Sequence, residues 1–229
     1  MGTWGAAMAK HQKTSMRFRP TILVPAAGRG RRFGGDGHKL AQAFGSGSGS
    51  GSSTVLGATL RNAVQTQLPV LCVTTESMAP LAWKQLARRD VLVLSDEQAA
   101  AGMGNSIALG VAERSGAPGW LVLPADMPLV KPATLLAVAS ALELHAVVYA
   151  QYKGRRGHPV GFAAELYSEL VLLTGDDGAR RVMLRYPAFG QDVEDAGALL
   201  DVDTVADLDT LRQAHGQDAP TGARPAASS

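Results

Sequence analysis

The chain alternates short apolar runs with segments whose apolar residues recur at helical spacing. The apolar runs are "TILV" (21–24), "PVLCVTT" (69–75), "VLVLS" (91–95), "WLVLPAD" (120–126) and "AVVYAQY" (146–152). Between them, helical spacing occupies residues 55–67, 81–89, 106–114 and 132–144. This alternation predicts one α/β domain with a mostly parallel sheet and helices on both faces. The runs are continuously apolar, as expected for strands that are buried on both sides.

The length of the chain suits a single domain. At 229 residues it can hold one such domain with a substantial core. We expect the domain to span residues 20–213, with a mobile extension before it (1–19) and a disordered tail after it (214–229). The tract Gly45–Ser53, "GSGSGSGSS", has the composition of a flexible linker. Too few residues precede the tract to fold alone, so we interpret it as a surface loop within the domain.

Charge and cysteine content argue against several classes of protein. The net charge is only +2, so we expect no broad surface for nucleic acid or for an acidic membrane. The sequence has no apolar stretch of the ~20 residues that a membrane span needs, and its first residues lack the apolar core of a secretory signal. The single cysteine, Cys72, lies in an apolar run and is interpreted as a small buried hydrophobe. These features together predict a cytoplasmic protein.

The first apolar run leads directly into a loop rich in glycine and positive charge, "PAAGRGRRFGGDGHKL" (25–40). Glycines let backbone N–H groups approach a ligand closely and form a concave anion site. The loop adds the charges of Arg29, Arg31, Arg32 and Lys39. Open α/β sheets bind ligands at the carboxyl ends of their strands, which favours a polyphosphate site over a solvated basic loop. The spacing matches neither the P-loop nor the dinucleotide-binding fingerprint.

A second polar feature follows the fourth apolar run, where "LVLPADMPLV" places Asp126 at the end of the predicted strand. If that strand is next to the first, Asp126 faces the glycine-rich loop. A carboxylate beside phosphate groups suits Mg²⁺, which prefers one or two protein carboxylates together with phosphate oxygens and water. The alternative is a structural carboxylate that forms an Asx-turn or caps the following helix. Because Asp126 occurs together with the glycine-rich loop, the metal interpretation is favoured over the structural one.

These two stretches resemble the MobA-like nucleotidyltransferases, which share a Rossmann-like, GT-A-like α/β fold. Four further stretches extend the resemblance: "GMGNSIALG", "GRRGHPVGF", "GDDGAR" and "DVDTVADL". The first is similar to the family's nucleobase segment, and the second is similar to its Gly-His-Pro substrate loop. The last two resemble late segments of the molybdenum cofactor cytidylyltransferase branch. The resemblance runs from about Thr21 to about Leu211, with the motifs in the family's order.

The resemblance implies a nucleotidyl transfer. The terminal phosphate of a molybdopterin-type acceptor attacks the α-phosphorus of a nucleoside triphosphate, and pyrophosphate leaves. It implies catalytic roles for Arg32, Lys39 and Asp126, and Mg²⁺ held by Asp126 and Asp203. By the same resemblance, the nucleotide contacts Ala26, Ala27, Gly28, Gly30, Arg32, Lys39, Gly104 and Ser106. The acceptor is expected to contact Arg156, His158, Pro159 and Arg180.

The resemblance also bears on the nucleotide. The cytidylyl-transferring branch reads Ala-Ala-Gly at the start of the loop, as in Ala26-Ala27-Gly28, whereas the guanylyl-transferring branch usually reads Ala-Gly-Gly. A Cβ atom at position 27 narrows the room beside the base, which favours CTP over GTP; exclusion by bulk is often worth ~1–3 kcal/mol. Expected partners are therefore CTP, a molybdopterin-type cofactor, and a recipient molybdoenzyme or its chaperone.

Several of these residues also have structural interpretations. His158 could be an ordinary loop histidine, Ser106 could lie at a helix N-cap, and Asp203 could belong to a helix start capped by Thr204. Two other functions remain open on this scaffold: a reductase that uses a nicotinamide cofactor, and a non-enzymatic chaperone for the molybdenum cofactor. Retention of the basic loop and of the two metal carboxylates favours the transferase.

Overall fold

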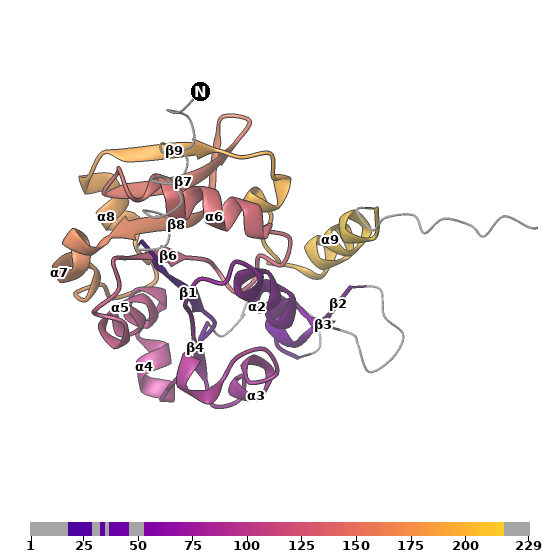
Figure 1. The fold of residues 1–229 in the computed structure, drawn as a ribbon. Helices are drawn as coiled ribbons and strands as arrows, with labels where there is room; N and C mark the ends of the chain where they lie inside the picture. The colour runs from indigo at the N-terminus through magenta and orange to yellow at the C-terminus, as the bar shows by residue number, and fades with distance from the viewer. Residues whose placement is uncertain (1–17, 29–32, 35–36, 46–52, 218–229) are drawn as a thin grey trace, which may run out of the picture.

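The centre of the fold is a seven-stranded sheet of order β5-β4-β1-β6-β8-β7-β9 (Figure 1). The computed structural model describes residues 18–28, 33–34, 37–45 and 53–217. The strands of this sheet are β1 (Thr21–Pro25), β4 (Val70–Thr75), β5 (Val91–Leu94), β6 (Gly119–Val122), β7 (Val147–Tyr152), β8 (Arg155–Ala163) and β9 (Ala188–Asp192). Strand β8 is antiparallel to both of its neighbours, whereas the other neighbouring strands pair in parallel. The sheet is thus mostly parallel, as the sequence predicts.

The five predicted strands are β1, β4, β5, β6 and β7, but the sequence did not reveal β8 and β9. Residues of "GRRGHPVGF", expected to form a substrate loop, lie in β8 instead. The second half of β8 is held on both sides, because Val160 pairs with Val122 of β6 and with Tyr149 of β7. Its first half continues the pairing with β7 alone, where Arg156 pairs with Gln151. The hydrogen bonds with β7 therefore keep the first half of β8 in an extended conformation, although its composition indicates a loop.

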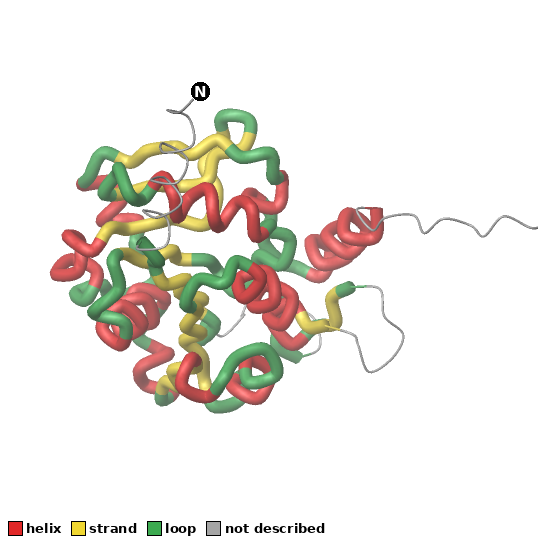
Figure 2. The backbone as a smooth tube through the Cα atoms, in the orientation of Figure 1, coloured by secondary structure: helices red, strands yellow, loops and turns green. Residues whose placement is uncertain are grey.

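Helices cover both faces of the sheet, as Figure 2 shows in red. They are α2 (Val55–Gln65), α3 (Ala79–Ala82), α4 (Asp96–Ala100), α5 (Met103–Glu113), α6 (Pro132–Ala141), α7 (Tyr167–Leu170), α8 (Arg180–Arg185) and α9 (Val205–Gln217). The predicted helices at 55–67, 106–114 and 132–144 correspond to α2, α5 and α6. The helix predicted at 81–89 is wrong beyond Ala82. Trp83 and Leu86 still pack against the core, but from the irregular segment that follows α3. Within the described residues, no helix has the length and apolarity needed to cross a lipid bilayer.

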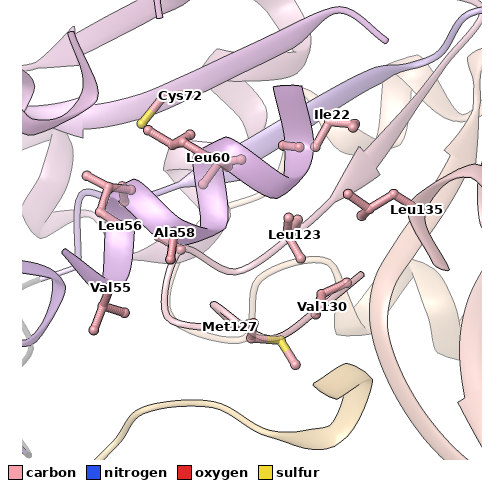
Figure 3. Packing of buried hydrophobic residues seen from close by; sticks show 14 of the residues in the cluster. Ile22, Val55, Leu56, Ala58, Leu60, Cys72, Leu123, Met127, Val130 and Leu135 are labelled. Atoms are coloured by element: carbon pink, nitrogen blue, oxygen red, sulfur yellow. The ribbon is translucent and has the colours of Figure 1, made fainter. Parts of the chain in front are cut away.

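Two separate hydrophobic layers pack against the sheet, one on each face. Side chains of β1 alternate between them: Ile22 and Val24 point into one layer and Leu23 into the other. Helices α2, α6 and α9 contribute to the first layer, and α5, α7 and α8 contribute to the second. Figure 3 shows the first layer, where Leu56 and Leu60 of α2 lie over the sheet. The sheet is therefore buried on both sides, which explains its continuous apolar runs.

The Gly/Ser tract lies between two short strands, β2 (Ala43–Phe44) and β3 (Ser53–Thr54). These strands pair antiparallel, with Ala43 opposite Thr54 and Phe44 opposite Ser53. Residues 46–52 are outside the described part of the chain. Thr54 then caps α2 by accepting a hydrogen bond from the Gly57 N–H at 3.0 Å. The paired flanks place the tract inside the domain, in agreement with its interpretation as a loop rather than a domain boundary.

The predicted ends of the domain need two corrections. Phe18 packs against the first hydrophobic layer, and Arg19 donates a hydrogen bond to the carbonyl oxygen of Gln67. These two residues belong to the folded part, although we placed them in a mobile extension. Helix α9 runs to Gln217, so residues 214–217 of the expected tail are helical. Residues 1–17 and 218–229 lie outside the described part of the chain.

Candidate functional site

A cavity of about 430 Å³ opens at the carboxyl ends of β1 and β6. Its walls come from five parts of the chain: the segment after β1, the segment after β6, the region of α4 and α5, and two later loops. Its lining residues are Pro25, Ala26, Ala27, Gly28, Phe33, Lys39, Leu40, Ala99, Ala100, Gly102, Met103, Ser106, Pro124, Ala125, Asp126, Asp176 and Asp203. This position matches the general rule for open α/β sheets.

The pairing of β1 with β6 explains why these segments meet. The strands are parallel, with Leu23 opposite Val122, and the Leu123 N–H donates a 2.9 Å hydrogen bond to the Leu23 carbonyl oxygen. On its other side β1 is extended by the Ala26 N–H, which donates to the Val73 carbonyl oxygen at 2.7 Å. Both loops therefore leave the same edge of the sheet. This confirms the condition on which the sequence interpretation of Asp126 depended.

Lys39 lies between two carboxylates in this cavity. Its ammonium is 2.6 Å from Asp126 Oδ2 and 3.0 Å from Asp203 Oδ1. The Lys39 and Asp126 side chains are only 14% and 19% exposed, so water screens this ion pair weakly. Burial lowers the pKa of Lys39, but the charges and hydrogen bonds of the two carboxylates outweigh that effect, so the pKa is raised. A positive charge thus occupies the position between the two predicted metal ligands.

Asp201 is a third carboxylate at this place, which the sequence reading missed. One ligand oxygen each of Asp126, Asp201 and Asp203 lie within 4.8 Å of one another. Val202 is fully buried between the two later aspartates, and alternate residues of an extended chain point the same way. The pKa of Asp201 is raised, first by burial and then by the charges of Asp126 and Asp203. The positive charge of Lys39 lowers this pKa but offsets only part of the increase. The Asp-Val-Asp spacing in the sequence could have indicated that Asp201 lies beside Asp203.

The structure gives no support to a capping role for Asp126. Its carboxylate binds Lys39, whereas the start of α6 is bonded by the carboxylate of Asp195. The cap predicted for Thr204 is present, because its hydroxyl accepts a hydrogen bond from the Asp207 N–H at 3.2 Å at the start of α9. Asp203 precedes that cap and points its carboxylate to Lys39. Asp203 therefore stands at a helix start and in the cavity at once.

His38 is a second residue that the sequence reading missed. Its Nδ1 accepts a hydrogen bond from the Leu40 N–H at 3.2 Å, so Nε2 carries the proton. Nε2 donates to the Gly28 carbonyl oxygen at 2.8 Å. The imidazole thereby ties the beginning of the glycine-rich loop to its end, next to Lys39. Among the predicted loop residues, Gly30 and Arg32 lie outside the described part of the chain.

The end of the cavity formed by α4 and α5 is mostly apolar. Helix α5 begins after Gly102, whose φ of 94° suits glycine, so the helix cap is Gly102 and not Ser106. Ser106 is 3% exposed and lines the cavity from inside the helix. Asp176 also lines this end, and its carboxylate has no hydrogen-bond partner among the described residues. Its oxygen lies against Gly102, where a Cβ atom would be 2.8 Å away.

Gly104, expected to contact the nucleotide, packs against a neighbouring loop. A Cβ atom at this position would lie 2.8 Å from the backbone of Thr174. Its N–H donates to the Gly175 carbonyl oxygen at 2.8 Å, and the Gly175 N–H donates back to the Ala101 carbonyl oxygen at 3.0 Å. These bonds hold the loop that carries Asp176 against the start of α5. Gly104 does not line the cavity.

The four residues expected to contact the acceptor lie outside the cavity walls. Arg156 and His158 are at the beginning of β8, and the Arg156 guanidinium lies 4.3 Å from the centre of the Tyr149 ring. Burial lowers the pKa of His158, while the charge of Asp126 and the Val122 backbone oppose the shift. The His158 Nδ1 is buried without a hydrogen-bond partner. Pro159 follows through a cis peptide bond, and Arg180 is exposed at the start of α8.

The cavity thus combines Ala26, Ala27, Gly28, Lys39, Ser106, Asp126 and Asp203 from the predicted set. Its carboxylates can hold a divalent cation, and Lys39 can neutralise a phosphate group. Ser106 is the one hydroxyl among the described lining residues, and no histidine accompanies it there. The arrangement therefore suits the alignment and charge neutralisation of a phosphate ester more than covalent catalysis by a side chain.

Comparisons with known proteins agree with this geometry. The model of the MobA-like NTP transferase domain matches residues 22–189. No protein with a curated description matches the sequence significantly. Rv0371c from Mycobacterium tuberculosis H37Rv is 28% identical, with 85% of this chain and 98% of that chain covered and a TM-score of 0.68. The same protein has also been solved as a complex with manganese, with a TM-score of 0.67 to this chain.

Two more distant structures share the fold. A nucleotidyl transferase from Methanothermobacter thermautotrophicus superposes with a TM-score of 0.70 at 21% identity, covering 87% of this chain and 98% of that chain. Molybdopterin-guanine dinucleotide biosynthesis protein A from Archaeoglobus fulgidus does so with a TM-score of 0.58 at 14% identity, covering 86% and 99%. The family match spans most of the chain, including β1, the loop after it and the Asp126 segment. The chain therefore belongs to the MobA-like NTP transferase family and is a nucleotidyltransferase by fold and family.

Proposed function

We propose that this protein transfers CMP from CTP to the terminal phosphate of a molybdopterin-type cofactor and releases pyrophosphate. The observation that carries the proposal is the position of Lys39 between Asp126 and Asp203, at the edge where β1 and β6 end side by side. A cation and acidic residues at this place form the arrangement that a metal-bound triphosphate needs.

The donor set fits Mg²⁺. Asp126 and Asp203 are the residues that would hold the ion, and Asp201 offers a third carboxylate within 4.8 Å. The Lys39 ammonium lies between two of these groups, which supports a position that attracts cations. When bound, Mg²⁺ supplies charge neutralisation at the phosphate oxygens. The manganese complex of Rv0371c supports a divalent cation in this family.

The reaction needs no nucleophile from the protein. An oxygen of the acceptor phosphate attacks the α-phosphorus of the nucleotide, and the bond between the α-phosphorus and the bridging oxygen breaks as pyrophosphate leaves. The work of the chain is to hold two anions close together. Lys39 transfers its hydrogen bonds from the carboxylates to the triphosphate, and the backbone at Gly28 lies along the same wall. Arg32 is proposed to add a further positive charge.

The nucleotide preference rests on the opposite end of the cavity. The Ala27 side chain is 3% exposed and lines the wall, so the position beside the base has a Cβ atom in place. Asp176 offers an unpaired carboxylate that can accept a hydrogen bond from an exocyclic amino group. Cytosine has such a group and is smaller than guanine, whereas uracil has none. CTP is therefore the proposed donor, and GTP is the alternative within the family.

The acceptor is proposed to approach from the beginning of β8. Because β8 is antiparallel to β6, its first residues lie at the edge where Asp126 follows β6. Burial lowers the pKa of His158, and the charge of Asp126 opposes that shift. Arg156 and Arg180 are exposed and can receive the phosphate of the acceptor. A recipient molybdoenzyme or its chaperone is proposed to take the product.

The deciding experiment supplies CTP and GTP at equal concentration with Mg²⁺ and a molybdopterin acceptor. We expect pyrophosphate release and a product that contains CMP. The Asp126→Asn variant should retain the fold, by circular dichroism, and lose about a hundredfold in turnover, the usual loss for one preorganised group. Glu143→Gln, an exposed change far from the cavity, is the control.

Each outcome has a separate meaning. A product that contains GMP would overturn the choice of nucleotide and leave the transferase standing. Absence of pyrophosphate with every nucleotide would overturn the transferase. In that case, oxidation of a nicotinamide cofactor should be measured, since the reductase is the other activity considered for this scaffold.

A further inference from the structure

Asp195 is a buried carboxylate that lies outside the cavity. The residue is 2% exposed and accepts three hydrogen bonds. The Lys131 N–H and the Thr134 hydroxyl donate to Oδ2 at 2.8 and 2.6 Å, and the Gly197 N–H donates to Oδ1 at 3.0 Å. Burial of a charge is costly unless it is fully hydrogen-bonded, so this position has a specific structural task.

The contacts at Oδ2 are with the start of α6. Lys131 is the residue before the first turn, and its own side chain makes no capping bond. Asp195, from a segment 64 positions later, satisfies the free backbone donor instead and places a negative charge at the positive end of the helix. The contact at Oδ1 holds the η4 turn (Ala196–Leu199), which leads into the segment with Asp201 and Asp203. One carboxylate thereby connects the two segments that carry the three clustered aspartates.

The same two segments touch at two further points. The Val202 N–H donates a 2.9 Å hydrogen bond to the carbonyl oxygen of Asp126 itself. Gly197 lies so close to Leu129 that a Cβ atom would be 2.3 Å from the Leu129 carbonyl oxygen. The chain after β6 and the chain after η4 are therefore in direct contact, with little freedom to slide. The spacing between Asp126 and Asp203 depends on this contact.

We propose that Asp195 is a positioning residue that fixes the distance between Asp126 and the Asp201–Asp203 segment, and so sets the affinity for a divalent cation. The inference rests on the metal site of the proposed function. Asp195 does not touch the cation or the substrate; it acts through the backbone of both segments. Groups that orient metal ligands in this way typically change metal affinity 10–100-fold when they are removed.

The division of contacts between the two oxygens provides a selective variant. In Asp195→Asn, the amide oxygen can still accept from Lys131 and Thr134 and keep the cap of α6. The amide nitrogen then faces the Gly197 N–H, so two donors meet and that link is lost. The variant should therefore keep the helix and release the Asp201–Asp203 segment. Val138→Ala removes two buried methyl groups of α6 and leaves the Asp195 carboxylate in place, so it is the matched control for lost stability.

The test measures Mn²⁺ binding to the full chain by calorimetry, together with amide exchange at Val202 in the metal-free protein. We expect Asp195→Asn to raise the Kd for Mn²⁺ by roughly tenfold or more, with Val138→Ala within twofold of the wild type. We also expect the Val202 amide to exchange faster in Asp195→Asn than in Val138→Ala. High Mn²⁺ should restore the turnover of Asp195→Asn, and the Val138→Ala control separates this effect from a loss of stability.

The outcomes separate the two proposals. An unchanged Kd and unchanged Val202 exchange in a folded Asp195→Asn protein would overturn the positioning role. Failure of the wild type to bind Mn²⁺ at all would overturn the metal site and with it the effect of Asp195 on cation affinity. If Asp195→Asn does not fold, Thr134→Val can be used, because it removes one of the three donors to Asp195. We then expect smaller changes in the Kd for Mn²⁺ and in the exchange of the Val202 amide, and unchanged values would overturn the positioning role.

Discussion

The Lys39 ammonium lies 2.6 Å from the Asp126 carboxylate, although the two residues are 87 positions apart in the chain. The same ammonium is 3.0 Å from Asp203. In the protein alone, Lys39 therefore compensates part of the charge of the two carboxylates that are proposed to hold a metal ion. Cation binding has to displace this ammonium, so metal and lysine compete until a triphosphate offers the lysine a new partner.

This competition predicts opposite effects of one substitution. Lys39→Met should bind Mn²⁺ more tightly than the wild type in the absence of nucleotide, because the competing charge is gone. The same variant should raise KM for CTP or lower kcat by about a hundredfold, since it lacks a preorganised group for the triphosphate. Calorimetry and steady-state kinetics measure the two effects, with exposed Lys84→Met as the control. Weaker Mn²⁺ binding in Lys39→Met would contradict the competition.

A second prediction concerns the bridge formed by His38. His38→Ala removes the hydrogen bond to the Gly28 carbonyl oxygen and should loosen the glycine-rich loop. One hydrogen bond contributes a net ~1 kcal/mol, so KM for the nucleotide should rise about fivefold with little change in the thermal midpoint. The measurement is a titration of CTP at saturating metal. An unchanged KM would show that the loop keeps its position without the imidazole.

A third prediction concerns the base end of the cavity. If Asp176 accepts a hydrogen bond from the cytosine amino group, Asp176→Asn should narrow the preference for CTP over UTP by roughly tenfold, because hydrogen bonds to charged groups contribute about 1.5–3 kcal/mol. Asp177→Asn, the exposed neighbour that does not line the cavity, should leave that preference unchanged. Competition between the two nucleotides gives the ratio directly. Equal ratios in both variants would remove Asp176 from base recognition.

The Gly/Ser tract should tolerate shortening. Replacing residues 46–52 by Gly-Ser-Gly keeps the paired flanks Ala43–Phe44 and Ser53–Thr54. The free energy of unfolding should change by no more than about 0.6 kcal/mol, the cost of one doubling of loop length. Phe44→Ala is the contrasting variant, because that side chain is 1% exposed and its loss should cost about 3 kcal/mol. Urea unfolding measures both, and a shortened protein that fails to fold would reveal a structural role for the tract.

Cys72 should be inert in the folded protein. Its side chain is completely buried, and burial raises the pKa of the thiol to about 12. We expect no reaction with a thiol reagent at pH 8 until the protein is unfolded in urea, and none at all in Cys72→Ala. The unfolded thiol ionises near its ordinary pKa of 9.0, whereas the folded one does not, so this group lowers the stability as the pH rises above 9.0. Rapid labelling of the native protein would contradict the buried position.

Much of the fold was predictable because burial on both sides leaves a direct mark on the sequence. The strands β1, β4 and β6 are buried at nearly every position and are mostly apolar, which is typical of strands covered on both faces. Strand β8 was not recognisable, because its first half is polar and contains glycine and proline. Its pairing with β7 follows from tertiary contacts, which a local pattern does not contain. The same holds for β9 at the edge of the sheet.

The site was partly predictable for a similar reason. The positions of Lys39, Asp126 and Asp203 follow from motifs at the ends of elements, and the structure brings them together. Asp201 and His38 were missed, since their importance lies in distances to groups from other segments. Gly104 was assigned to the nucleotide by resemblance, and the structure adds a packing contact there, because the backbone of Thr174 leaves no room for a Cβ atom.

The sheet also divides the interior into two compartments that share only its backbone. Ile22 and Leu23 are consecutive residues, yet each belongs to a different hydrophobic layer. A change of volume on one face can be compensated by neighbours on that face but not across the strands, and distant effects of this kind are additive. During divergence, the two faces can therefore change at different rates. Covariation between related sequences should follow the layers, linking Ile22 with Leu60 and Leu23 with Val111, and should be weak between one layer and the other.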